Sequence, residues 1–189
     1  LRMIAGFETA TSGQIKIGER IVNDLKPADR NVAMAFEGYA LYPPLTVKDN
    51  IAFSLMREKI SKDKVDSKVM EVAELLEITD ILERYPPSIS GGQQQRVSLA
   101  RALVRDSDAL LLDEPMSQLE PQLRAVLRAR VKDYIQHNNK TVIFVTHDQT
   151  EAVALADKIA VMENGDLKQL ASPYEISAKP SNVFVASFI

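Results

Sequence analysis

Cysteine is absent from this chain of 189 residues. The fold can therefore contain neither disulfide bridges nor thiolate metal sites. No apolar run approaches the roughly 20 residues that a membrane-spanning helix needs, so we expect any membrane role to come through a partner protein. Internal repeats and low-complexity tracts are missing as well, which excludes solenoid and disordered-tract architectures.

An excess of basic residues is also missing. The chain has 23 Lys and Arg against 26 Asp and Glu, a formal net charge of −3, and this balance argues against a broad basic surface for nucleic acid. With 46% hydrophobic and 26% charged residues, the composition is that of a globular protein. The length suffices for one domain that buries most of its apolar surface.

A serine and two glycines open a helical pattern near the middle of the chain. Ser90-Gly91-Gly92-Gln93 precedes apolar residues at helical spacing from Val97 to Val104. Backbone N–H groups at the start of a helix attract anions, phosphate above all. Taken alone, the segment could equally be an ordinary flexible turn.

Two carboxylates follow an aliphatic run. Leu110–Leu112 predicts a buried strand, with Asp113 and Glu114 at its carboxyl end, where a magnesium ion and an attacking water could be held. The alternative is a core strand that simply meets solvent. His147 similarly follows the apolar run Thr141–Val145, where a surface or capping role is the alternative.

In this order, with Asp113 twenty positions after Gln93, these segments resemble the signature and Walker B motifs of ATP-binding cassette (ABC) ATPases. His147 resembles their switch histidine. Ser117–Glu120 resembles the D-loop and Ala35–Pro43 the Q-loop region.

This resemblance implies an α/β P-loop NTPase core with a parallel sheet, an antiparallel hairpin portion and a helical signature subdomain. The strand, helix, strand order after the signature independently favours a parallel crossover. We expect residues 1–40 to be a remnant of the N-terminal ATPase core, 41–105 the helical subdomain, and 106–189 the C-terminal part of the core.

Local patterns predict the remaining elements. An antiparallel hairpin is expected around Gly18, and a second at Asn164-Gly165, because Asn-Gly is a strong hairpin signal. The other expected elements are a buried strand and four helical stretches, at 31–36, 47–56, 65–76, 149–157 and 180–189.

The resemblance also implies roles for individual residues in ATP and Mg²⁺ binding. Asp113 would hold magnesium through its hydration shell, Glu114 would polarise the attacking water, and His147 would contact the γ-phosphate and orient the glutamate. In this family two subunits pair head to tail, so the signature meets the nucleotide of the partner. The expected nucleotide-binding residues are Ser90, Gly91, Gly92, Gln93, Ser117 and Glu37.

Two positions depart from the family pattern. Glu37, also a candidate magnesium ligand, stands where glutamine is usual, and Glu120 stands where aspartate is usual. A carboxylate at position 37 could bind Mg²⁺ more strongly than an amide, yet its charge near the triphosphate could slow turnover. The departures could mark one member of a heterodimeric ATPase pair, or only drift at tolerant positions.

Three segments narrow the resemblance to the ATPase subunits of carbohydrate importers of the maltose and multiple-sugar type: Tyr39–Pro43, His147–Ala152 and Phe184–Ile189. The implied function is ATP hydrolysis that energises uptake of a sugar, polyol or related solute. The implied partners are membrane permease subunits, a second ATPase subunit and, indirectly, a solute-binding protein, with no nucleic acid. The implied location is the cytoplasmic face of the inner membrane, as a peripheral protein.

No Gly-x-x-x-x-Gly-Lys-Ser/Thr pattern occurs in the chain. Leu1–Gly6 looks like the end of the helix that follows a Walker A loop. We therefore expect a fragment of a longer protein, lacking that loop and a C-terminal regulatory domain, and inactive in isolation. The alternatives are a catalytically impaired or regulatory subunit and a soluble ABC ATPase of nucleic-acid metabolism.

Overall fold

The computed structural model describes residues 1–36, 38–56 and 58–188. These residues fall into two compact units, Leu1–Val145 and Thr146–Ile189, and each is described by itself. The three domain ranges expected from the sequence remain a prediction.

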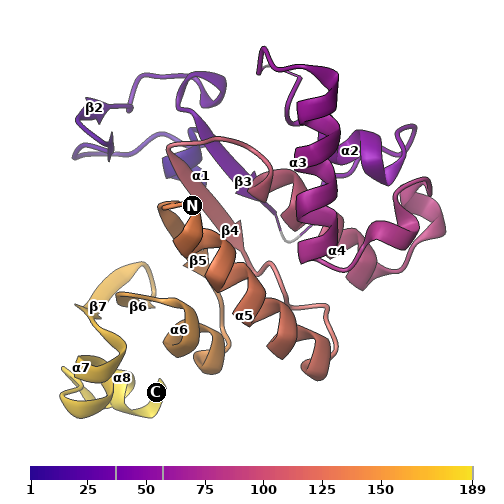
Figure 1. Ribbon diagram of the computed structural model, residues 1–189. Helices are drawn as coiled ribbons and strands as arrows, with labels where there is room; N and C mark the ends of the chain where they lie inside the picture. Colours follow the sequence, from indigo (N-terminus) through magenta and orange to yellow (C-terminus); the bar gives the residue numbers. More distant parts are fainter. Residues whose placement is uncertain (37, 57, 189) are drawn as a thin grey trace. The chain divides into compact units, whose positions relative to one another are not determined.

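The first unit is organised around a three-stranded parallel sheet (Figure 1). Its strands stand in the order β3 (Val32–Ala35), β4 (Ala109–Asp113) and β5 (Val142–Val145). Ala35 pairs with Leu112, and Asp113 pairs with Val145. The predicted parallel sheet is confirmed, and the carboxylate that ends β4 lies at its C-terminal edge.

The central strand is buried because its side chains are aliphatic on both faces. Leu110, Leu111 and Leu112 are at most 1% exposed, as expected for an inner parallel strand. On β5, in contrast, Ile143 and Val145 are 39% and 41% exposed. The core of this unit therefore lies around β4 and the helices beside it.

Helices that precede β4 in the chain cover this sheet and each other. The helix α4 (Gly91–Leu103) packs against β3 and β4, while α2 (Val47–Phe53) and α3 (Lys62–Leu75) pack on α4. After β4, α5 (Pro121–His137) leads to β5 and contacts α3. The predicted helices near residues 47–56 and 65–76 are confirmed, with starts and ends shifted by a few residues.

The N-terminal part of the first unit is held by a buried arginine. Arg30 is 3% exposed and donates to the carbonyl oxygens of Met3, Ile4, Leu25 and Asn23 at 2.8 to 3.1 Å. The elements of this part are α1 (Arg2–Ala5) and the antiparallel pair β1 (Lys16–Ile17) and β2 (Arg20–Ile21). The hairpin around Gly18 is thereby confirmed. Single 3₁₀ turns lie at Pro27–Asp29, Thr79–Ile81 and Pro86–Ser88.

The second unit is a hairpin with three short helices. It contains α6 (Gln149–Leu155), β6 (Ile159–Glu163), β7 (Asp166–Ala171), α7 (Pro173–Ala178) and α8 (Val183–Phe188). Asn164 and Gly165 form the hairpin turn with φ of 51° and 88°, the left-handed values that a type I′ turn requires. The predicted hairpin and terminal helix are confirmed, and α7 is an element that the periodicity does not predict.

Among the described residues, no helix combines the length and hydrophobicity that crossing a bilayer requires.

Candidate functional site

The Ser-Gly-Gly segment forms the first turn of α4, capped by its own side chains. Ser90 Oγ accepts from the backbone N–H of Gln93 at 3.3 Å, and Gln93 Oε1 accepts from the backbone N–H of Ser90 at 2.9 Å. This reciprocal capping box satisfies amides that the helix itself cannot. The predicted helix start is confirmed, while its contact with a nucleotide stays a prediction.

The two glycines of this turn have different surroundings. A Cβ on Gly92 would lie 3.2 Å from the carbonyl oxygen of Gln118 and 3.5 Å from Cδ2 of Leu119. Within the described part of the chain, a Cβ on Gly91 would meet only Tyr39 Oη, at 3.8 Å. The start of α4 therefore lies against the loop that follows β4, and it comes that close because position 92 has no side chain.

The backbone is strained at Glu114, where the chain leaves β4 and enters this loop. Asp113 ends the strand, and Glu114 has φ of 47°, a left-handed conformation that costs a non-glycine residue about 1–2 kcal/mol. The Glu114 N–H donates to the carbonyl of Val145 at 3.0 Å. Its own carbonyl accepts from the N–H and the hydroxyl of Ser117, at 3.3 and 3.2 Å.

Two helices hold the loop after Glu114. From α4, Gln95 Nε2 donates to the carbonyl of Glu114 at 2.9 Å and to Ser117 Oγ at 3.1 Å. From α5, Arg124 Nη2 donates to the carbonyls of Ser117 and Leu119, at 3.1 and 3.0 Å. The segment from Glu114 to Leu119 is thereby fixed to elements that precede it and follow it in the chain.

Asp113 and Glu114 are both partly exposed, so they can be reached by a ligand. The described residues contain no group of three or more His, Cys, Asp or Glu side chains that could enclose a metal ion. Magnesium in phosphate-transfer sites needs only one or two carboxylates, and substrate phosphates and water complete its shell. The partly exposed carboxylate at the strand end fits that pattern, and Asp113 as a magnesium ligand remains a prediction.

His147 belongs to the second unit and is exposed between β5 and α6. The residues around it are ordered by hydrogen bonds: Asp148 Oδ1 accepts from the N–H of Glu151 at 3.1 Å, capping α6. Thr146 Oγ1 donates to Glu151 Oε2 at 2.8 Å. The approach of His147 to Glu114 is a prediction, as are the roles of Glu37, which lies outside the described residues.

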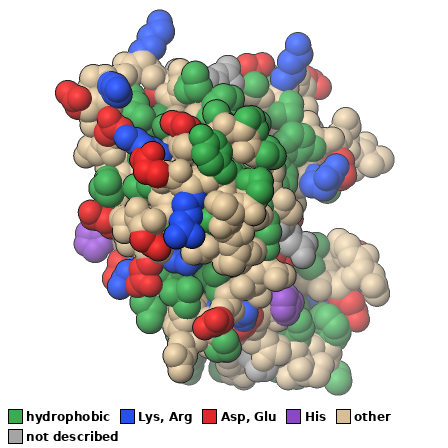
Figure 2. All heavy atoms as spheres, turned by 90° about the vertical axis from the view of Figure 1, so that its right-hand side faces the viewer, with side chains coloured by type: hydrophobic (Ala, Val, Ile, Leu, Met, Phe, Trp, Pro, Cys, Tyr) green, Lys and Arg blue, Asp and Glu red, His purple; other side chains and the backbone are tan. Residues whose placement is uncertain are grey.

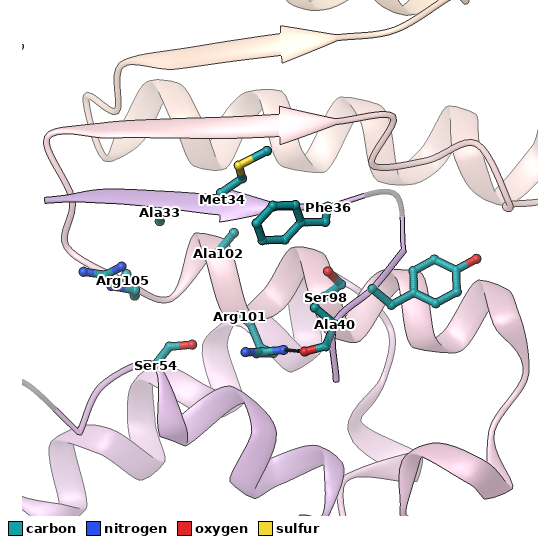
Figure 3. A pocket seen from close by; sticks show the side chains of 10 residues that line it. Ala33, Met34, Phe36, Ala40, Ser54, Ser98, Arg101, Ala102 and Arg105 are labelled. Carbon is teal, nitrogen blue, oxygen red and sulfur yellow. Dashed lines mark hydrogen bonds between the residues drawn. The ribbon is translucent and has the colours of Figure 1, made fainter. Parts of the chain in front are cut away.

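A hollow of about 140 Å³ opens beside the C-terminal half of α4, between the end of β3 and the end of α2 (Figure 3). Arg101 points toward it and donates from Nη1 to the carbonyl of Ala40 at 2.5 Å. The same guanidinium lies 4.9 Å from the ring centroid of Tyr42. Burial lowers the pKa of Arg101. The other lining residues are Ala33, Met34, Phe36, Tyr39, Ser54, Ser98, Ala102 and Arg105.

Sequence reasoning missed Gln95, Arg124 and Arg101 as supporting residues. For Gln95 a signal existed, because it falls three residues after Gly92 and four before Leu99, on the helix face that the apolar periodicity marks as buried. A polar side chain on such a face needs a partner. For the two arginines the sequence offers no comparable signal.

Comparison with known proteins places these motifs in one family. The family described as ABC transporter matches residues 1–117. The sn-glycerol-3-phosphate import ATP-binding protein UgpC of Rhodopseudomonas palustris (strain BisB18) is 49% identical over 100% of this chain and 52% of that protein. UgpC of Ruegeria pomeroyi is 47% identical over 100% of this chain and 54% of that protein. The chain spans about half the length of the curated relatives it matches.

A solved structure shares the fold. The ATP-binding cassette MJ0796, in a dimeric post-hydrolysis state bound to ADP and Pi, superimposes with a TM-score of 0.81 and 26% sequence identity. The match covers 91% of this chain and 78% of that one.

Proposed function

Because this chain belongs to the ABC transporter family, we propose that it forms part of the ATP-hydrolysing subunit of an importer. One observation carries the proposal: the start of α4 lies against the loop that follows the two carboxylates at the end of β4. Gly92 lies against Gln118, and Gln95 contacts Glu114. A phosphate-binding helix start and a carboxylate pair are two of the parts that such hydrolysis uses.

In the proposed mechanism Glu114 polarises the water that attacks the γ-phosphate. Its backbone is held by hydrogen bonds at both the N–H and the carbonyl, which limits the directions its carboxylate can take. Asp113 would hold Mg²⁺ through the hydration shell, and that ion would neutralise charge on the phosphate oxygens. His147 would contact the γ-phosphate.

The signature residues would act on the nucleotide of a second ATPase subunit. Ser90 and Gly91 are exposed, so another molecule can reach the amides of this turn. The relative MJ0796 is dimeric with ADP and Pi bound, which supports a pair of subunits that each complete the other's site. The serine hydroxyl and the glycine N–H groups suit contact with a γ-phosphate.

The permease partner would dock beside Arg101. Beside this arginine lie two exposed aromatic rings: Tyr42, whose ring centroid is 4.9 Å from the Arg101 guanidinium, and Phe53 are 41% and 43% exposed, and their ring centroids are 4.7 Å apart. Met56 nearby on the chain is 73% exposed. Aromatic residues and methionine are enriched in protein interfaces. This contact would place the protein at the cytoplasmic face of the membrane as a peripheral subunit.

The solute would be sn-glycerol-3-phosphate or a related sugar or polyol. UgpC relatives at 44% to 49% identity over the whole chain are named for import of that compound. The nucleic-acid alternative gains no support from the surface. Figure 2 shows Lys and Arg side chains interspersed with Asp and Glu on the face that it draws, so the described residues there form no continuous basic field.

The test is Glu114→Gln in the native protein that contains this chain, assembled with its permease. We expect ATP turnover to fall at least about 100-fold, since one group at the reacting water is lost, while nucleotide affinity changes little. The matched control is Glu83→Gln, an exposed carboxylate that should leave turnover within about twofold. A wild-type assembly that neither binds nor hydrolyses ATP would contradict the proposal.

A further inference from the structure

Gln95 is a buried polar residue in the middle of an otherwise apolar contact. It lies on α4 and is 2% exposed, one turn after Gly92. Burying an amide stabilises a fold only when its donors and acceptor find partners. The side chain of Gln95 finds them all on one segment, the loop after β4.

Both the nitrogen and the oxygen of the Gln95 side-chain amide make hydrogen bonds. Its Nε2 donates to the Glu114 carbonyl at 2.9 Å and to Ser117 Oγ at 3.1 Å. Its Oε1 accepts from the N–H of Gln118 at 2.9 Å. Three contacts to three residues fix the loop in rotation as well as in distance.

The first of these contacts acts on the strained residue. Glu114 has a left-handed φ of 47°, and a residue in that region keeps its conformation only when its surroundings hold it there. Gln95 and Ser117 together supply the donors to its carbonyl. Loss of the Gln95 donor would remove the one restraint on this peptide that comes from α4, and the direction of the carboxylate would be less tightly fixed.

We infer that Gln95 is a positioning residue that sets the backbone of Glu114 from the helix whose first turn is Ser90–Gln93. This inference rests on the proposed function, which places Ser90–Gln93 on the nucleotide of the partner subunit and Glu114 on the nucleotide of its own. Gln95 then connects the two nucleotide sites of a dimer within one helix. When the partner's ATP contacts Ser90, the position of Glu114 is affected through one turn of α4 and the side-chain amide of Gln95.

The experiment compares two neighbouring glutamines in the native protein assembled with its permease. Gln95→Met keeps the length of the side chain and removes all three contacts. Gln94→Met is the matched control, because Gln94 Nε2 donates to the carbonyls of Pro86 and Ile89, at 3.0 and 3.3 Å, both of which precede α4. Both variants lose side-chain hydrogen bonds on the same helix.

We expect Gln95→Met to lower kcat for ATP at least about tenfold with KM within about twofold, since a misplacement of 1 Å at a reacting group can cost that much or more. Gln94→Met should lower the melting temperature and leave kcat within about twofold. If Gln95→Met does not fold, Gln95→Glu replaces it, because the carboxylate keeps the acceptor for Gln118 and removes the donor to Glu114. The same loss in kcat is expected.

A double-mutant cycle with Ser117→Ala separates positioning from loss of stability. The effects of Gln95→Met and Ser117→Ala on kcat should be non-additive, since both act on the Glu114 carbonyl. The effects of Gln94→Met and Ser117→Ala should add. Equal kcat in the Gln94 and Gln95 variants, or a change confined to KM, would overturn the inference. Absence of ATP turnover in the wild-type assembly would instead overturn the proposed function.

Discussion

The guanidinium of Arg30 occupies the space that a side chain on Gly6 would need. A Cβ at that position would lie 2.6 Å from Nε and 2.9 Å from Cζ of Arg30. Gly6 has φ of 86° and ends α1, where Arg30 Nη1 donates to the carbonyls of Met3 and Ile4. The arginine thus adds donors to carbonyl groups at the C-terminal end of this helix, and Gly6, which has no side chain, leaves room for the guanidinium.

Gly6→Ala should destabilise the protein by about 2–4 kcal/mol, from the left-handed backbone and the clash with Arg30 together. Urea unfolding measures the change. Gly13→Ala is the control, because Gly13 also has a positive φ, 81°, but its Cβ would meet nothing within 4 Å in the described part of the chain. Gly13→Ala should cost only the strain of the left-handed backbone, about 1–2 kcal/mol. Equal costs for the two variants would contradict a close contact at Gly6.

Gly92→Ala should be about 1 kcal/mol more destabilising than Gly91→Ala, because the new methyl group at position 92 would lie 3.2 Å from the backbone carbonyl oxygen of Gln118. Both positions lie in the first turn of α4, so helix propensity contributes equally to the two. Thermal unfolding of the two variants side by side measures the difference. An equally stable pair would show that the loop after β4 yields to the methyl group.

Asp66 should titrate below the ordinary aspartate range. Its hydrogen bond with the Lys48 ammonium, at 2.8 Å, lowers the pKa of Asp66. Because the folded pKa is the lower one, this pair stabilises the fold above the unfolded value of about 3.9, and the stabilisation is lost as the pH falls through the folded pKa. NMR titration of the carboxyl carbon measures the midpoint. Lys48→Met should return it toward the ordinary value, and an unchanged midpoint would refute the pairing.

The main sheet could be predicted from the sequence because its signals are local. Leu110–Leu112 is long enough and apolar enough to indicate an inner strand, and the strand, helix, strand order then predicts the parallel pairing with β5. The Asn164-Gly165 turn is equally local. The positions of Asp113 and Glu114 follow from their place at the end of such a strand.

The supporting contacts could not be predicted in the same way. Periodicity shows that Gln95 faces inward, but not that its partner is the carbonyl of Glu114, nineteen residues away. No sequence pattern around Arg30 predicts that its guanidinium is buried and donates to four backbone carbonyl groups. The helix α7 is a different case, because Ser172 and Glu175 form a capping box whose spacing is readable in the sequence. Its start could have been predicted from those two residues.

The capping box at Ser90 fixes the first turn of α4. The hydroxyl of Ser90 and the amide oxygen of Gln93 are already engaged with each other's backbone. Because Ser90 Oγ is the acceptor in this box, the O–H of the same group can still donate to an anion without loss of a cap that is worth about 1 kcal/mol. In the proposed function one hydroxyl therefore both fixes the helix start and faces the phosphate. Replacing Ser90 by alanine would remove the cap and the donor together.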